Sequence, residues 1–237
     1  MSRIRFSFAR KIELAYVSHL DQVRLFLRAL SRSRLPIAYS QGFNPHPRLI
    51  LALPLPLGVT ADEEYGEIFF SEEILPEQFL SALKVQMPAA IELTGAVVVD
   101  PGAPSLASLV GAALYRAALR ADHAGLVDQP ALQAALDRLL AKDEILMQRK
   151  SKKNKITYTN VRPFILEAAL ETNRAGLFTI NMLLQAGSQG GVSPAFLLEQ
   201  IEAETGSSVF HAYEWRLHRE RLYIVQEGVL QPFSEGM

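Results

Sequence analysis

Apolar residues near the start of the chain recur with two different periods. Over residues 3–9 every second side chain is apolar, and Ile4, Phe6 and Phe8 share one face, which predicts a β-strand. After Ser18 the apolar positions recur every three or four residues, as on the buried side of a helix. These positions are Leu20, Val23, Phe26, Leu27 and Leu30. Ser18 suits the N-cap of this helix, with Asp21 close to capping-box spacing.

The same mixture of short strands and amphipathic helices continues along the chain. Up to residue 99, we predict strands at 35–40, 48–53, 67–70 and 91–99 and a helix that begins at Pro76. Further on, we predict strands at 115–120 and 178–184, a helix at 131–140, a hairpin at 145–150 and 155–158, and a helix from Ser193-Pro194 to Ile201. Residues 161–171 either extend the sheet or begin a helix, and Trp215, Leu217, Leu222 and Ile224 mark a terminal hairpin.

A tract rich in proline and glycine at residues 100–105 divides this pattern. The order before it is β-α-β-β-α-β or a close variant with an extra strand, and a similar order recurs after it. We therefore expect an α+β fold of two tandem ferredoxin-like units. The N-terminal domain would be 1–100 and the C-terminal domain 106–237.

Composition narrows the class of protein. The chain has 237 residues, 49% of them hydrophobic and 21% charged, as in an ordinary globular protein, and a formal net charge of −1. The absence of cysteine excludes disulfides, thiolate catalysis and iron–sulfur clusters. His123, His211 and His218 lack metal-ligand spacing, so we expect no metal and no cofactor. The N-terminus lacks a signal-peptide hydrophobic region and no apolar run reaches bilayer length. We expect a cytoplasmic protein without a membrane partner.

The first predicted helix carries a charged stripe beside its apolar one. Asp21, Arg24, Arg28 and Ser31 recur at spacings of three and four. Arginine presents paired donors that suit phosphate or carboxylate. The stripe is either a ligand-binding face or a solvated one. For Asp21, capping and pairing with Arg24 are a sufficient explanation.

A stiff turn follows this helix. Gly42 permits unusual backbone angles, and Pro45 and Pro47 bias Asn44 and His46 towards extended geometry. Ser40, Gln41 and Arg48 flank the turn. Rigid loops with these side chains serve binding or proton transfer, or the turn is braced by proline with His46 merely exposed.

Residues 149–155 hold five cations in seven residues: Arg149, Lys150, Lys152, Lys153 and Lys155. Such a cluster is typical of phosphate-backbone binding, and Arg162 would extend it. The alternative is a solvated hairpin tip whose lysines keep an exposed edge from pairing with other chains. Tyr39 and Phe43 could stack on bases, although Phe43 suits a core equally.

Four segments together resemble the radical SAM-associated protein family. They are Tyr16 to Asp21, Arg28-Ala29-Leu30, Leu35 to Pro47 and Pro54-Leu55-Pro56-Leu57-Gly58. A weaker resemblance continues at Val161-Arg162-Pro163-Phe164-Ile165, where Asn160 stands in place of an expected acidic residue. The resemblance implies an accessory module fused to, or encoded beside, a cobalamin-binding radical SAM protein, in an RNA-related setting. Without cysteines the chain cannot hold the radical-generating cluster itself.

Three functions remain open. The leading one is a non-catalytic partner of a radical SAM protein that binds RNA or a phosphate-bearing substrate. Its candidate binding residues are Ser18, His19, Asp21, Arg24, Arg28, Tyr39, Ser40, Gln41, Asn44, His46, Arg48, Lys150, Lys152, Lys153, Lys155 and Arg162. The second is a metal-independent RNA-processing or RNA-modifying enzyme in which His19, Asp21 and His46 converge in one pocket. The third is a protein-interaction module alone.

Overall fold

The computed structural model describes residues 2–119, 128–150, 154–172, 178–205, 214–226 and 229–233. The chain forms two compact units. Unit 1 contains residues 1–111 and 219–237, and unit 2 contains residues 112–218. Helices and strands occur in both units, so the predicted α+β class is confirmed. None of the described helices is both long and apolar enough to cross a membrane.

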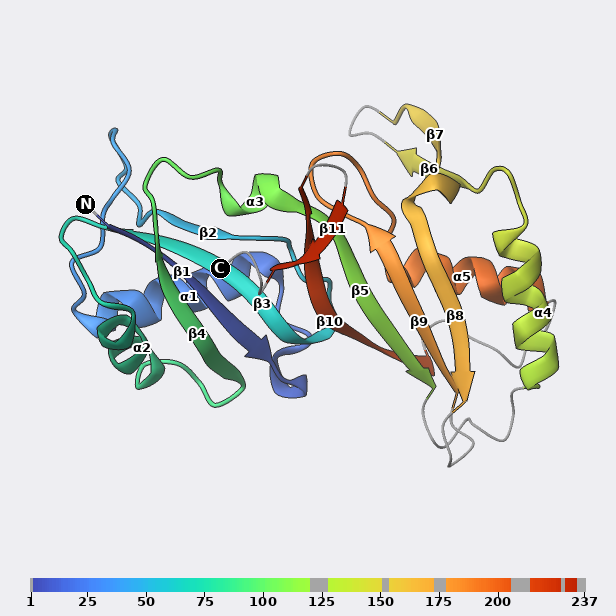
Figure 1. Ribbon diagram of the computed structural model, residues 1–237, viewed down its shortest axis with the longest axis horizontal. Helices are drawn as coiled ribbons and strands as arrows, with labels where there is room; N and C mark the ends of the chain where they lie inside the picture. The colour runs from blue at the N-terminus through green and yellow to red at the C-terminus, as the bar shows by residue number, and fades with distance from the viewer. Residues whose placement is uncertain are drawn as a thin grey trace. The chain divides into compact units, whose positions relative to one another are not determined.

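The sheet of unit 1 follows the strand order β4-β1-β3, with β2 also paired to β3 (Figure 1). Its strands are β1 (Ser2–Arg10), β2 (Leu49–Leu51), β3 (Thr60–Phe70) and β4 (Ile91–Val99). All three pairings are antiparallel. The helices are α1 (His19–Ser33), α2 (Pro76–Lys84) and the short α3 (Leu106–Leu109). The predicted start of α2 at Pro76 is confirmed.

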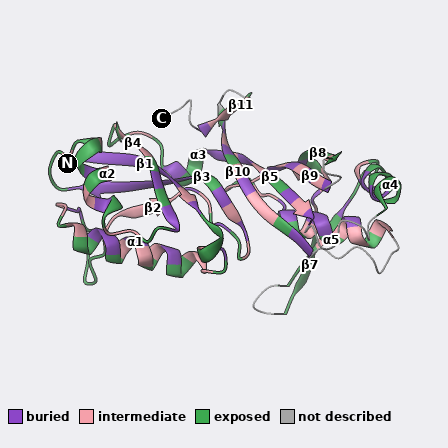
Figure 2. Cartoon of the chain, turned by 90° about the horizontal axis from the view of Figure 1, so that it is seen from below, coloured by how far each residue is buried: buried purple, intermediate pink, exposed green. Residues whose placement is uncertain are grey.

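One face of this sheet carries the apolar core. Ile4, Phe6 and Phe8 pack with α1 and α2 through Phe26, Ala29, Leu30, Phe79 and Leu83. Figure 2 shows α1 as alternating buried and exposed bands, as an amphipathic helix requires. Gly66 lies opposite Phe6, where an added Cβ would approach the ring to 2.3 Å. The bulky ring therefore requires glycine at that position.

The other face of β1 is buried as well, and it is polar. Arg3 donates to Glu67 Oε2 at 2.6 Å, and Arg5 donates to Glu67 Oε1 at 2.8 Å. The backbone N–H of Leu106 also donates to Glu67, whose side chain is fully buried. The alternation in β1 thus divides an apolar face from an ion-paired face, and both are covered.

Two details of unit 1 differ from the predictions. Residues 35–40 form no continuous strand, because Pro36 lacks an N–H donor, and only Ile37 and Tyr39 make isolated bridges. Leu20 was expected in the buried stripe but is exposed, whereas Gln22 is buried and accepts a hydrogen bond from Arg10.

In unit 2, β5 (Val110–Leu119) pairs with β9 (Phe178–Gln185), which pairs with β8 (Ile165–Thr172). Helices α4 (Gln129–Leu140) and α5 (Pro194–Thr205) pack together. A separate two-stranded sheet, β6 (Leu146–Lys150) and β7 (Ile156–Asn160), confirms the predicted hairpin. After a turn of 3-10 helix, η3 (Arg162–Phe164), β8 extends the sheet, which settles the open choice for residues 161–171.

The predicted terminal hairpin is present, but Trp215, Leu217, Leu222 and Ile224 all lie on its first strand. One strand, β10 (Trp215–Gln226), runs through these positions, and its hairpin partner is β11 (Val229–Pro232). Polar Arg219 interrupts the apolar pattern, but it is fully buried and pairs with Glu64 of β3. A buried ion pair therefore lies within β10.

Candidate functional site

One concave surface of unit 1 lies along α1. One cavity of about 400 Å³ is lined by Val17, Asp21, Arg24, Leu25, Arg28 and Arg32. A second, of about 440 Å³, is lined by Leu27, Arg28, Ser31, Arg32, Tyr39 and Pro47. Both cavities share Arg28 and Arg32, and we call the two together the α1 groove.

Helical spacing places three arginines along this groove. Arg24, Arg28 and Arg32 are four residues apart, so their side chains follow one face of α1, and all three are exposed. Arg24 is held by Asp21 at 2.8 Å, and Arg32 donates to the backbone oxygen of Gln86 at 2.7 Å. Within the described part of the chain, Arg28 makes no hydrogen bond or ion pair. Its five donors are therefore available to an anion.

Asp21 has two local roles. The Ser18 hydroxyl accepts from the Asp21 N–H at 3.2 Å and donates to the Asp21 carboxylate at 2.7 Å. The hydrogen bonds from Ser18 and Arg24 lower the pKa of Asp21. Ser18 thus caps the helix by accepting the Asp21 N–H, and the Asp21 carboxylate binds the Ser18 hydroxyl and Arg24.

His19 lies at the first position of α1, above the buried Arg10. Burial lowers the pKa of His19, and the positive charge of Arg10 lowers it further. Arg10 donates to Gln22 and to the backbone oxygens of Val17, Pro56 and Val59. Burial lowers the pKa of Arg10 to about 10, so it stays protonated at neutral pH. It ties the start of α1 to the proline-rich loop before β3.

The turn after Tyr39 is closed by its own side chains. The Ser40 N–H donates to the His46 carbonyl at 2.9 Å, and the His46 N–H donates to the Ser40 hydroxyl at 3.1 Å. The hydroxyl also contacts His46 Nδ1 at 2.9 Å. Gly42 adopts φ +124°, in the region that favours glycine. Phe43, at the tip, is fully exposed, so the core alternative for this residue is wrong.

Only the two ends of the turn line the α1 groove. Tyr39 and Pro47 line the second cavity, whereas Gln41, Asn44 and His46 are exposed beyond it. Arg48 instead stacks on Phe69 at 3.8 Å, and Phe69 faces the side of β3 opposite to the apolar core. Neither cavity is lined by His19 or His46. Of the three residues in the enzyme hypothesis, only Asp21 reaches the α1 groove.

The remaining candidates belong to unit 2. The Arg162 guanidinium donates to the Leu140 carbonyl at 2.8 Å and to the Ile165 carbonyl at 3.2 Å, so it caps the C-terminal end of α4. Lys150 and Lys155 are exposed on the hairpin. Lys152 and Lys153 lie outside the described residues.

Several important residues carried little signal in the sequence. Arg32 lies in the last turn of α1, where a cation also favours the helix dipole, yet it lines both cavities. Arg10 lies outside the strand predicted at 3–9, and its role depends on neighbours from other segments. Among the described residues, no group of three His, Asp or Glu side chains is placed to hold a metal ion.

Comparison with known proteins gives a family. Residues 3–194 match the family described as "Uncharacterized protein conserved in bacteria (DUF2344)". No curated protein matches the chain. The matched range includes α1, the turn at His46 and the β6–β7 hairpin, and it covers most of the 237 residues. The chain therefore belongs to the DUF2344 family of uncharacterized proteins conserved in bacteria.

Proposed function

We propose that this protein is a non-catalytic accessory protein of a radical SAM enzyme and that its α1 groove binds RNA or another phosphate-bearing substrate. One observation carries the binding proposal: two cavities share Arg28 and Arg32, and Arg28 makes no hydrogen bond or ion pair within the described residues. Arginine donors in an open groove match phosphate oxygens in number and geometry.

The surroundings of Arg28 support a nucleotide ligand. Tyr39 lines the second cavity and is half exposed, so its ring is accessible to a base. Fully exposed Phe43 lies on the same turn. Phosphate contacts from arginine combined with aromatic stacking are typical of single-stranded RNA binding.

Binding without turnover is favoured over the alternative of RNA cleavage or modification. His46 contacts Ser40, whereas Asp21 is engaged by Ser18 and Arg24. Burial and the charge of Arg10 lower the pKa of His19, but His19 does not line the groove. An acid–base pair needs both groups within reach of one substrate atom.

We also infer that both units are ferredoxin-like. In unit 1 the strand order β4-β1-β3-β2 and the sequence order β-α-β-β-α-β support this topology. In unit 2, β5, β8 and β9 with α4 and α5 support the same topology, with the β6–β7 hairpin as an insertion. Ferredoxin-like folds host many functions, so this architecture adds no weight to RNA binding.

The binding proposal predicts salt-dependent affinity. Fluorescence anisotropy with a labelled twelve-nucleotide single-stranded RNA should show affinity falling about seven- to twentyfold between 50 and 200 mM salt, for two or three phosphate contacts. Arg28→Glu should weaken binding by about tenfold or more, because it removes charge-assisted hydrogen bonds.

Arg34→Glu is the matched control. Arg34 is exposed at the C-cap of the same helix but lines neither cavity, so the same change of net charge should have a much smaller effect. Equal loss of RNA affinity in both variants would show that the RNA responds to the overall positive charge of α1 and not to the groove. Absent or salt-independent binding would refute the proposal and leave a protein-interaction module.

The accessory role has a separate test. RNA crosslinked to the protein in cells should be sequenced with and without the radical SAM enzyme. We expect the bound RNA set to change when the enzyme is absent. An unchanged set would argue against the partnership while leaving RNA binding intact.

A further inference from the structure

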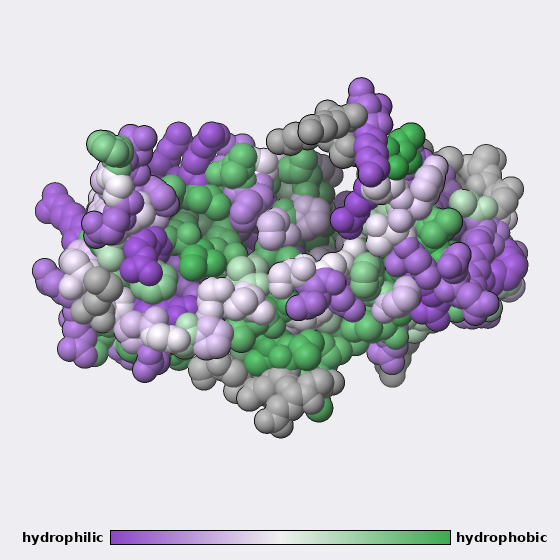
Figure 3. All heavy atoms as spheres, turned by 90° about the horizontal axis from the view of Figure 1, so that it is seen from above, coloured by the Kyte–Doolittle hydropathy of each residue, from purple (hydrophilic) through white to green (hydrophobic). Residues whose placement is uncertain are grey.

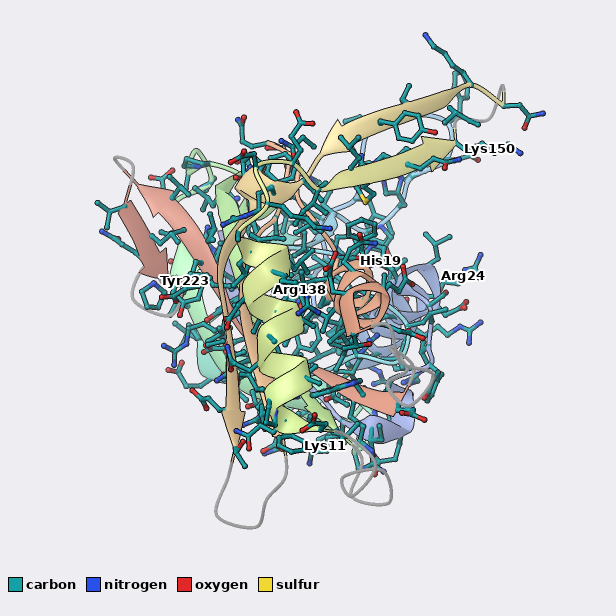
Figure 4. All side chains as sticks on the ribbon, turned by 90° about the vertical axis from the view of Figure 1, so that its right-hand side faces the viewer. Lys11, His19, Arg24, Arg138, Lys150 and Tyr223 are labelled. Carbon is teal, nitrogen blue, oxygen red and sulfur yellow. The ribbon has the colours of Figure 1, made fainter. Side chains whose placement is uncertain are left out.

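The β6–β7 hairpin exposes apolar side chains on a ribbon with two open edges. Its five residue pairs run from Leu146↔Asn160 to Lys150↔Ile156. Within the described residues, β6 and β7 pair only with each other. Figure 1 shows the hairpin standing apart from the other strands of its unit, and Figure 4 shows Lys150 towards its outer end.

One face of this ribbon carries three of the four apolar residues of β6 and β7, and Met147 lies on the other face. Residues directly opposite in an antiparallel pair point to the same side, and alternate residues share a face. Leu146, Lys150, Ile156 and Tyr158 therefore share one face, which we call the hairpin face. Arg149 and Thr157 lie opposite each other on the other face.

The hairpin face is exposed. Leu146 is 56% exposed, Ile156 49% and Tyr158 63%. Isolated two-stranded ribbons are marginally stable in water, and clustered exposed apolar residues mark interaction sites. Figure 3 shows hydrophobic spheres beside hydrophilic ones where the hairpin projects.

The base of the hairpin is held firmly, so the face is presented in a defined direction. Ile145 and Val161, which flank the two strands, are buried, and the Val161 N–H donates to the Ile145 carbonyl at 2.8 Å. Asn160 Oδ1 accepts from the N–H groups of Ile145 and Arg162, both at 3.0 Å. A face anchored in this way loses little conformational entropy on binding.

The charge and the area of the hairpin face indicate which kind of molecule binds there. The described hairpin residues, 146–150 and 154–160, include Arg149, Lys150 and Lys155 but no carboxylate, so two copies of the ribbon would repel each other. Five residues in each of two strands offer a face of roughly 170 Å², far below the about 800 Å² per partner of a stable globular interface. That area suits a short peptide segment. Aliphatic Leu146 and Ile156 offer a nucleic acid neither stacking nor hydrogen bonds.

We propose that the hairpin face binds a short, extended, acidic segment of a partner protein. Apolar side chains of the segment cover Leu146, Ile156 and Tyr158, and its carboxylates pair with Lys150. Its backbone has open strand edges beside it for β-addition. This site is in unit 2 and does not depend on the α1 groove.

The test uses a labelled ten-residue peptide with the repeat Val-Ser-Glu-Ser, so that valine and glutamate share one side of the extended chain. Anisotropy should show binding to the full chain, and a peptide with lysine in place of glutamate should not bind. Tyr158→Ser should weaken binding about tenfold, because an aromatic residue in the contact is lost. Lys150→Gln should weaken binding about threefold, because it removes one exposed charge pair.

Arg149→Gln is the matched control, because Arg149 precedes Lys150 on the same strand but faces the other side. It should weaken binding less than Lys150→Gln does. Circular dichroism and hydrogen exchange at β6 and β7 check that each variant keeps the hairpin. Equal effects of Arg149→Gln and Lys150→Gln would overturn the proposal. So would binding of a ten-nucleotide single-stranded RNA with no binding of the acidic peptide, or no binding of either probe.

Discussion

Buried arginines are the main feature of unit 1 at the scale of single residues. Arg3, Arg5, Arg10 and Arg219 are all buried, and the buried carboxylates in the described part of unit 1 are Glu64 and Glu67. Arg10 donates to neutral oxygen acceptors; burial lowers its pKa to about 10, while the charge of Glu64 raises it. A buried charge without partners would be costly, so each carboxylate is strongly constrained.

Glu67→Gln should destabilise unit 1 by about 3–5 kcal/mol, because it removes the negative charge between Arg3 and Arg5. Urea denaturation followed by circular dichroism measures the change. Glu72→Gln, at an exposed position, should change stability by less than about 0.5 kcal/mol. A similar small effect in both variants would show that the buried network contributes little.

At the scale of elements, one junction in unit 2 organises three of them. Arg162 caps α4, while Asn160 joins the start of β6 to the end of β7. Asn160 occupies the position where the family resemblance predicted an acidic residue. An aspartate oxygen can accept the same two backbone N–H groups, so either residue fits this structural role. The junction therefore explains the position without a catalytic carboxylate.

Asn160→Ala should destabilise unit 2 by about 1–3 kcal/mol, since two backbone donors lose their acceptor. Asn160→Asp should retain most of the stability and lose only the bond to the Asp143 carbonyl. Hydrogen exchange at the amides of Ile145 and Arg162 distinguishes the variants. If these two amides exchanged as fast in Asn160→Asp as in Asn160→Ala, the result would contradict this role.

For the molecule as a whole, the decisive feature is that unit 1 is built from both ends of the sequence. Residues 219–237 join residues 1–111 in one compact unit. Arg219 pairs with Glu64, and the ring of Phe233 lies 4.4 Å from that of Tyr65. The predicted boundary at residues 100–105 places these C-terminal residues with the second half of the chain. Unit 1 therefore needs a segment more than a hundred residues away.

A chain that ends at His218 should lose about 3–5 kcal/mol of stability in unit 1, because Glu64 would be buried without its arginine. A chain that ends at Phe233 keeps both contacts and is the control. Thermal unfolding should show the loss only in the shorter chain. Replacing Glu64 with Leu in that chain should recover part of the stability, and no recovery would exclude the unpaired carboxylate as the cause.

Local patterns determined much of this protein from sequence. The Ser18 cap, the start of α2 at Pro76, the β6–β7 hairpin and the exposed arginine stripe were predicted because each depends on neighbours within a few residues. The same holds for the pairing of Asp21 with Arg24.

Only the tertiary structure decided which polar residues are buried and which candidates meet. Arg3 and Glu67 are 64 residues apart and Arg219 and Glu64 are 155 apart, and neither distance along the chain leaves a periodic trace. Tyr39 joins Arg28 in the α1 groove while His46, seven residues further on, does not, because the turn projects beyond its base. Hydrophobic period reports which side of an element is covered by apolar side chains, whereas ion pairs and cavities form only between elements that the fold brings together.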